Sequence, residues 1–127
     1  MSTAAWFLSD LAPSRHTIEN EMRLAFWNTG YKQMWFTCVK DQSPIECNGK
    51  WRDKSFSVAF EPKKSLALKM QEPDQELLAA FERVLGHRAL AAYRDNGSVV
   101  VEWRVKDGDV RYQELQKSSA KELERLN

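Results

Sequence analysis

The sequence has few of the residues and runs that mark specialised protein classes. Its 127 residues include only two cysteines, five glycines and four prolines, which excludes a disulfide-dense scaffold, a collagen-like repeat and a low-complexity disordered chain. It contains no run of about eighteen apolar residues, so no transmembrane helix is expected. The segment from Met1 to Ser14 contains no Lys or Arg, and its apolar stretch is too short for a signal peptide. We therefore expect a soluble, intracellular protein of the cytoplasm.

The cysteines and the charge balance exclude further classes. Cys38 and Cys47 lack the paired spacing of a zinc site, and in a reducing cytoplasm we expect both to be free thiols. The formal net charge is only +1, so the chain has no overall polybasic or acidic character. A charge-driven partner would therefore have to bind a local patch.

The length and the order of patterns predict one α+β domain over residues 1–127. We expect a largely antiparallel sheet of about five strands with two to four helices packed on it. The expected segments are an N-terminal helical segment (1–30, with a helix from Thr17 to Asn28), a basic aromatic strand region (31–70), a helical segment (73–94), a β-hairpin (98–115) and a C-terminal helix (116–127).

Within the strand region, the pattern favours three strands at residues 33–39, 55–60 and 66–70. Asp41 to Lys54 is expected to connect the first two, because Ser43-Pro44 and Asn48-Gly49 are turn formers. Strand periodicity also predicts that Phe56, Val58 and Phe60 share a buried face and that only one of Trp35 and Phe36 faces solvent.

The second half contains the clearest helix, from Pro73 to Leu85, with acidic and polar residues at its start and Gly86 at its end. Residues 87–94 suit a helix or a strand, and their alanines favour a helix. Ser98 to Val105 is a predicted strand whose hairpin partner is expected at 110–115 after a turn at 106–109. Asn96-Gly97 is expected to form a turn.

The aromatic content suggests a binding function. The chain has five Trp residues, and the strand region has eight Lys or Arg residues but only four Asp or Glu. We expect a small binding protein without cofactor or catalysis, which acts as a regulator, inhibitor or adaptor on a protein partner. Trp51 lies in a turn-rich, charged segment and is the aromatic residue expected to be most exposed. Trp and Arg are enriched at interface hot spots, and the expected partner-binding residues are Trp51, Arg52, Lys54, Trp103 and Arg104.

The alternative partner is single-stranded nucleic acid, because flat rings stack on unpaired bases while Lys and Arg follow the phosphates. The segregation of charge along the chain would also allow a homodimer. The residues that would contact nucleic acid are Lys32, Trp35, Lys50, Trp51, Arg52, Lys63 and Lys64.

An enzyme is the third hypothesis, because no phosphate loop, nucleophile elbow or metalloprotease helix occurs. Cys38 could act as a nucleophile only with His16 or His87 as its base, and nothing in the spacing supports that pair. Asp107 and Asp109 fit a turn better than a calcium loop. We therefore expect no catalytic, cofactor-binding or metal-binding residues.

Overall fold

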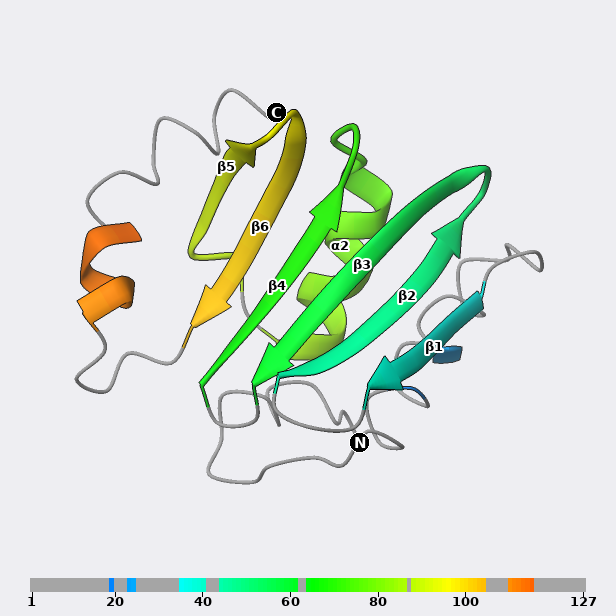
Figure 1. The fold of residues 1–127 in the computed structure, drawn as a ribbon, viewed down its shortest axis with the longest axis horizontal. Coiled ribbons are helices and arrows are strands. Elements are labelled where there is room, and N and C mark those ends of the chain that lie inside the picture. Colours follow the sequence, from blue (N-terminus) through cyan, green and yellow to red (C-terminus); the bar gives the residue numbers. More distant parts are fainter. Residues whose placement is uncertain are drawn as a thin grey trace.

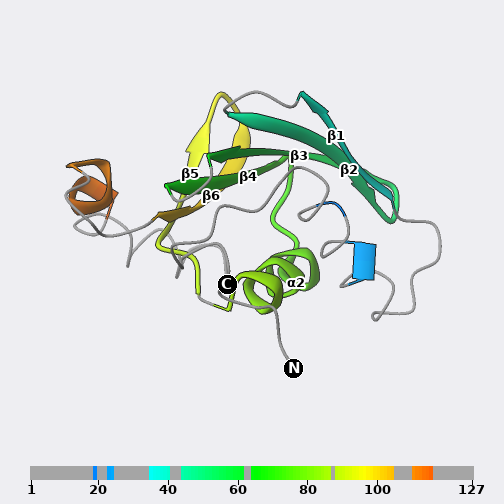
Figure 2. The same cartoon turned by 90° about the horizontal axis from the view of Figure 1, so that it is seen from below.

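A computed structural model of the chain describes residues 19, 23–24, 35–40, 44–61, 64–86, 88–104 and 110–115. Six antiparallel strands form one sheet, and a helix packs on one of its faces (Figures 1 and 2). The chain is thus a small α+β fold, as predicted, with one strand more than expected. In chain order the elements are β1 (Trp35–Lys40), β2 (Ile45–Trp51), β3 (Lys54–Glu61), β4 (Ser65–Met70), α2 (Gln75–Leu85), β5 (Ala91–Asp95) and β6 (Ser98–Arg104).

The strand order in the sheet is β1-β2-β3-β4-β6-β5. Each neighbouring pair is antiparallel, and α2 connects β4 to β5. Asn96 and Gly97 join β5 to β6 with φ angles of 52° and 84°, the left-handed backbone that a two-residue type I′ hairpin requires. The turn predicted at these two residues is therefore confirmed.

The core lies between the sheet and α2. Phe56, Val58 and Phe60 are all buried on the face that α2 covers, as predicted. The Phe81 ring of α2 meets Phe56 edge to face at 5.9 Å and stacks on Trp103 of β6 at 6.1 Å. Aromatic pairs at these separations add stability beyond the apolar area that they bury.

The predicted helix is confirmed at α2 and ends at Gly86 as predicted, but it begins at Gln75, two residues after the expected start at Pro73. Asp74 is the N-cap, and its Oδ1 accepts a hydrogen bond from the backbone N–H of Leu77 at 3.0 Å. Gly86 has a φ of 75° and donates its N–H to the carbonyl of Glu82, the usual left-handed C-terminal geometry.

Two strands occupy segments for which we expected other structure. β2 lies in the predicted connection from Asp41 to Lys54, and Asn48-Gly49 is part of this strand because both residues pair with β1 and β3. The Phe56 ring occupies the space that a Cβ at Gly49 would take. β5 replaces the helix expected at 87–94. Its pairing with β6 outweighs the helix propensity of its alanines, which is a weak preference.

The hairpin partner expected at residues 110–115 is also wrong, because these residues are helical. β6 pairs with β4 on one side and with β5 on the other, so it has no free edge for a further strand. Residues 19, 23 and 24 are helical, in agreement with the N-terminal helix. Most of that predicted helix, the turn at 106–109 and the C-terminal helix at 116–127 lie outside the described residues.

The two cysteines form a disulfide rather than the expected free thiols. Cys38 and Cys47 are register partners on β1 and β2, and both are buried. The pairing depends on strand register, which spacing alone did not show. The bond leaves Cys38 without a thiol for nucleophilic catalysis, and the prediction of a reducing compartment loses its support from the cysteines.

Candidate functional site

The two tryptophans predicted to bind a partner are core residues. Trp51 is 0 % exposed and Trp103 is 1 % exposed. Trp51 is the last residue of β2, in phase with Ile45 and Cys47 on the buried side of that strand. The prediction that Trp51 is the most exposed aromatic residue is therefore wrong, and neither ring is available to a partner on this surface.

The predicted basic residues are engaged within the molecule. Arg52 Nη2 lies 2.7 Å from Glu76 Oε2, and Lys54 Nζ lies 3.7 Å from Glu72 Oε2. Arg104 pairs with Glu102 at 3.5 Å and lies opposite Ser65 at the far end of the sheet from Lys54. The five residues therefore do not form one binding surface.

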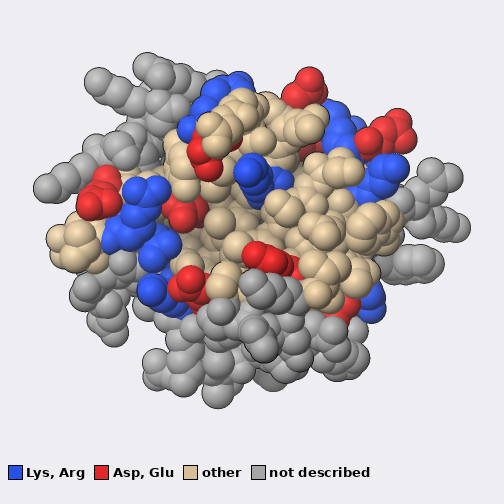
Figure 3. Space-filling view, in the orientation of Figure 1, with Lys and Arg blue, Asp and Glu red and all other residues tan. Residues whose placement is uncertain are grey.

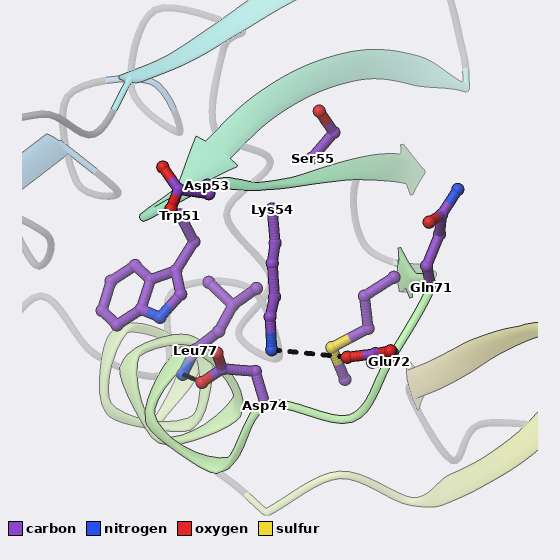
Figure 4. Close-up of a pocket in the computed structure, with 9 residues that line it drawn as sticks. Trp51, Asp53, Lys54, Ser55, Gln71, Glu72, Asp74 and Leu77 are labelled. Atoms are coloured by element: carbon purple, nitrogen blue, oxygen red, sulfur yellow. Dashed lines mark hydrogen bonds and ion pairs between the residues drawn. The ribbon is translucent and has the colours of Figure 1, made fainter.

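A cavity of about 340 Å³ lies beside Lys54, between the turn from β2 to β3 and the start of α2 (Figure 4). The Lys54 side chain extends toward Glu72, while Asp74 bonds to the backbone of Leu77. These charged groups connect the sheet to the helix, so the cavity has a structural explanation. Its lining residues are Trp51, Asp53, Lys54, Ser55, Met70, Gln71, Glu72, Asp74 and Leu77.

The face of the sheet opposite α2, here called the open face, is a better candidate. Among the described elements, residues 110–115 touch it at the β5–β6 end, where Arg111 contacts Glu102 and Tyr93, and no described helix covers its middle (Figure 2). Uncharged surface covers much of it, with charged side chains spread over it and around its margin (Figure 3). Two hollows of about 250 and 370 Å³ lie on this face, and both are lined by Asn48, Ser57 and Lys69. These three residues are register partners on β2, β3 and β4.

Small side chains on the two central strands produce this hollow, which we call the trough. Its floor consists of Ser55, Ser57 and Ala59 on β3 and Ala67 on β4. Longer side chains on the neighbouring strands flank the floor on both sides. They are Glu46 and Asn48 on β2, Val100 on β6 and Tyr93 on β5.

Exposed apolar side chains line one margin of the open face. Trp35 is 47 % exposed and Val39 is 61 % exposed, both on β1. Phe36 points into the core, so the prediction that only one of Trp35 and Phe36 faces solvent is confirmed. Trp35 lies directly opposite Lys50 in the register of β1 and β2. An aromatic ring and an ammonium group are thus neighbours at this margin.

Lys50 and Lys69 on the open face differ from the lysines and arginines that form ion pairs elsewhere in the described part of the chain. Both are exposed on the open face, and in the part of the chain that the structure describes neither takes part in an ion pair. Arg52, Lys54 and Lys64, in contrast, each pair with a glutamate. The two lysines therefore offer positive charge to a partner.

The residues predicted to contact nucleic acid are divided by the fold. Trp35 and Lys50 lie together on the open face, whereas Trp51 is buried. Arg52 and Lys64 are exposed but belong to ion pairs, and Lys32 and Lys63 lie outside the described residues. Strand alternation and register, which the sequence did not reveal, separate these residues.

A charged cluster near β5 attaches residues 110–115 to the sheet, and sequence reasoning missed it. Glu102 is only 7 % exposed and lies between Arg104 and Arg111, at 3.5 and 3.7 Å. The Arg111 guanidinium lies 5.6 Å from the ring centre of Tyr93, within the range of a cation–π contact. Burial, and then the charge of Glu102, raise the pKa of Tyr93 above its ordinary value.

The two edges of the sheet differ. On β1, Cys38 donates its N–H to Glu19 Oε2 at 3.3 Å, and Arg23 Nε donates to the carbonyl of Phe36 at 3.1 Å. On β5, the alternation set by the hairpin turns the backbone groups of Ala92 and Arg94 away from β6, and no described residue bonds to them. Side chains therefore occupy the β1 edge, whereas no described residue occupies the β5 edge.

Comparison of the chain with protein-family models, curated proteins and solved structures finds no match. No described helix is long and apolar enough to cross a membrane. Within the described ranges, no three His, Cys, Asp or Glu side chains are grouped as metal ligands. The earlier candidates His16, His87, Asp107 and Asp109 lie outside those ranges.

Proposed function

We propose that the chain is a binding protein without catalytic activity, which docks on a protein partner through the open face of its sheet. In this role it acts as a regulator, inhibitor or adaptor. The observation that carries the proposal is the trough beside the exposed side chains of Trp35 and Val39. Tryptophan is enriched among interface residues, and a concave surface increases the area that a partner buries.

Single-stranded nucleic acid is the second candidate, because Trp35 lies opposite Lys50 and could stack on a base while the ammonium group contacts a phosphate. The same face carries the acidic side chains of Glu46 and Asp95, which repel phosphates. A protein partner accommodates both signs of charge, so the open face favours a protein.

Photo-crosslinking tests the proposal. Thr37 is exposed on β1 between Trp35 and Val39. In the test variant, the photo-crosslinking residue p-benzoylphenylalanine replaces Thr37 in the cells that produce the protein. Ala79, exposed on α2, carries the same group in a matched control. We expect a protein adduct from position 37 and none from position 79. Absence of an adduct at position 37, or an adduct that nuclease digests, would contradict the proposal.

A further inference from the structure

The dimensions of the trough fit an α-helix. The strands that carry the two margins of the trough, β2 and β6, are three strand spacings or about 14 Å apart, and between them the long side chain of Lys69 stands beside the small-residue floor. A helix with its side chains is about 10–12 Å wide. The floor from Ser55 to Ala59 is about 13 Å long, the length of about nine helical residues.

Backbone hydrogen bonding also favours a helix over an extended peptide. β3 pairs with β2 and β4, and β4 pairs with β3 and β6, so the strands under the trough have their backbone groups in the ladders of the sheet. An extended segment lying on this face would find few backbone partners, whereas a helix satisfies its backbone groups internally. On the other face, α2 already packs in this way (Figure 2).

The charges at the trough indicate which helix fits. Lys69 stands in the same row as Asn48 and Ser57, and Lys50 lies opposite Ser55 at one end of the floor. Neither lysine has an ion-pair partner in the described part of the chain. Acidic side chains on the occupant would supply these partners, and its residues beside Glu46 and Asp95 would be basic or uncharged. The exposed side chain of Val39 would contact its apolar stripe.

We infer that the occupant of the trough is an amphipathic helix of the partner protein that carries Asp or Glu beside Lys50 and Lys69. This inference rests on the proposed function. The docked helix would lie over β3 and β4 opposite α2, so that the sheet would have a helix on each face.

Selection from a displayed peptide library tests the inference. The peptides have about twelve residues, long enough to cover the floor as a helix, and half of them carry a central proline that prevents a helix. The bait is the whole oxidised protein. We expect enriched peptides to come from the proline-free half, with apolar residues at helical spacing and Asp or Glu on the flanks.

Charge reversal supplies the site-specific control. In the variant with Lys50→Glu and Lys69→Glu, an enriched acidic peptide should bind about tenfold more weakly, because two exposed ion pairs are replaced by repulsion. The matched control, with Arg88→Glu and Arg94→Glu, has the same net charge and changes exposed residues outside the trough. Its affinity should stay within about twofold of that of the unmodified protein.

Three results would overturn the inference. They are enrichment of proline-containing peptides, equal loss of affinity in both charge-reversed variants, and competition by single-stranded oligothymidylate for the same lysines. If a protein adduct at position 37 accompanies either of the first two results, the proposed function stands and only the inference of an acidic helix as the occupant is wrong. If position 37 gives no protein adduct, the proposed function fails as well.

Discussion

The disulfide between Cys38 and Cys47 should contribute a large share of the stability of this domain. Its partners are nine positions apart, so the bond closes a loop of about ten residues. In the chain-entropy model, such a loop lowers the entropy of the unfolded chain enough to stabilise the fold by about 2.7 kcal/mol. Breaking the bond should reduce the free energy of unfolding by this amount.

Urea unfolding of the oxidised and the reduced protein measures the effect. Trp51 and Trp103 are buried, so tryptophan fluorescence will report their exposure. With an m-value of about 1–3 kcal/mol per molar urea, reduction should lower the midpoint by about 1–2.7 M. The double variant Cys38→Ala and Cys47→Ala should unfold at a similarly low concentration, and a reducing agent should leave its midpoint unchanged.

Two results would refute this reasoning. Thiol titration of the denatured, non-reduced protein that detects two free thiols per chain would show that the bond is absent. A reduction-induced loss below about 0.5 kcal/mol, with the bond verified by mass, would show that closing the loop restricts the unfolded chain far less than the entropy model requires.

Three further changes test the helix cap, the packing at β2 and the charged cluster. Asp74→Ala should lower the stability measured by thermal unfolding by about 1 kcal/mol, because the N–H of Leu77 loses its acceptor. Asp74→Ser should keep most of that stability, and equal losses in the two variants would contradict the capping role. Gly49→Ala should cost about 1–3 kcal/mol in urea unfolding, because the new Cβ overlaps the Phe56 ring, and an unchanged midpoint would be evidence against this contact. Burial raises the pKa of Tyr93 above 10.0, so the contribution of Tyr93 to stability should be intact below pH 10 and be lost as the pH rises through the folded pKa. Tyr93→Phe should flatten this fall in the free energy of unfolding measured against pH, and an unaltered slope would contradict the role of Tyr93.

Local patterns predicted the elements whose signals lie within a few residues. Gly86 marked the end of α2, and the acidic and polar residues after Pro73 marked its first turn, because both signals depend on the adjacent backbone. The alternation of Phe56, Val58 and Phe60 predicted the buried side of β3. These features depend on side chains that are neighbours along the chain.

The errors at β2 arose because its strand signal depends on a distant residue. Asn48-Gly49 is a turn signal in isolation, yet the Phe56 ring of β3 occupies the side of the strand that Gly49 leaves empty. Once Gly49 is counted as a strand position, Ile45 and Trp51 lie on the same side, and that side is buried. The charges next to Trp51 indicated exposure, but strand phase determines its burial.

The candidate site could not be predicted because it depends on strand order. Trp35 and Lys50 were both identified from the sequence, but their pairing across β1 and β2 was not. Lys69 was not selected, and only the register with Asn48 and Ser57 brings it into the trough. Residue types suggested a binding protein, whereas strand order and register define the surface.

The unequal edges of the sheet limit how copies of this chain can add to one another. A sheet with two open edges can join copies head to tail without end, which leads to fibres. Here the Glu19 and Arg23 side chains occupy the backbone groups of Phe36 and Cys38 at the β1 edge. Of the two edges as the described residues leave them, only β5 could pair with β5 of a second copy, and such a symmetric contact closes at two chains.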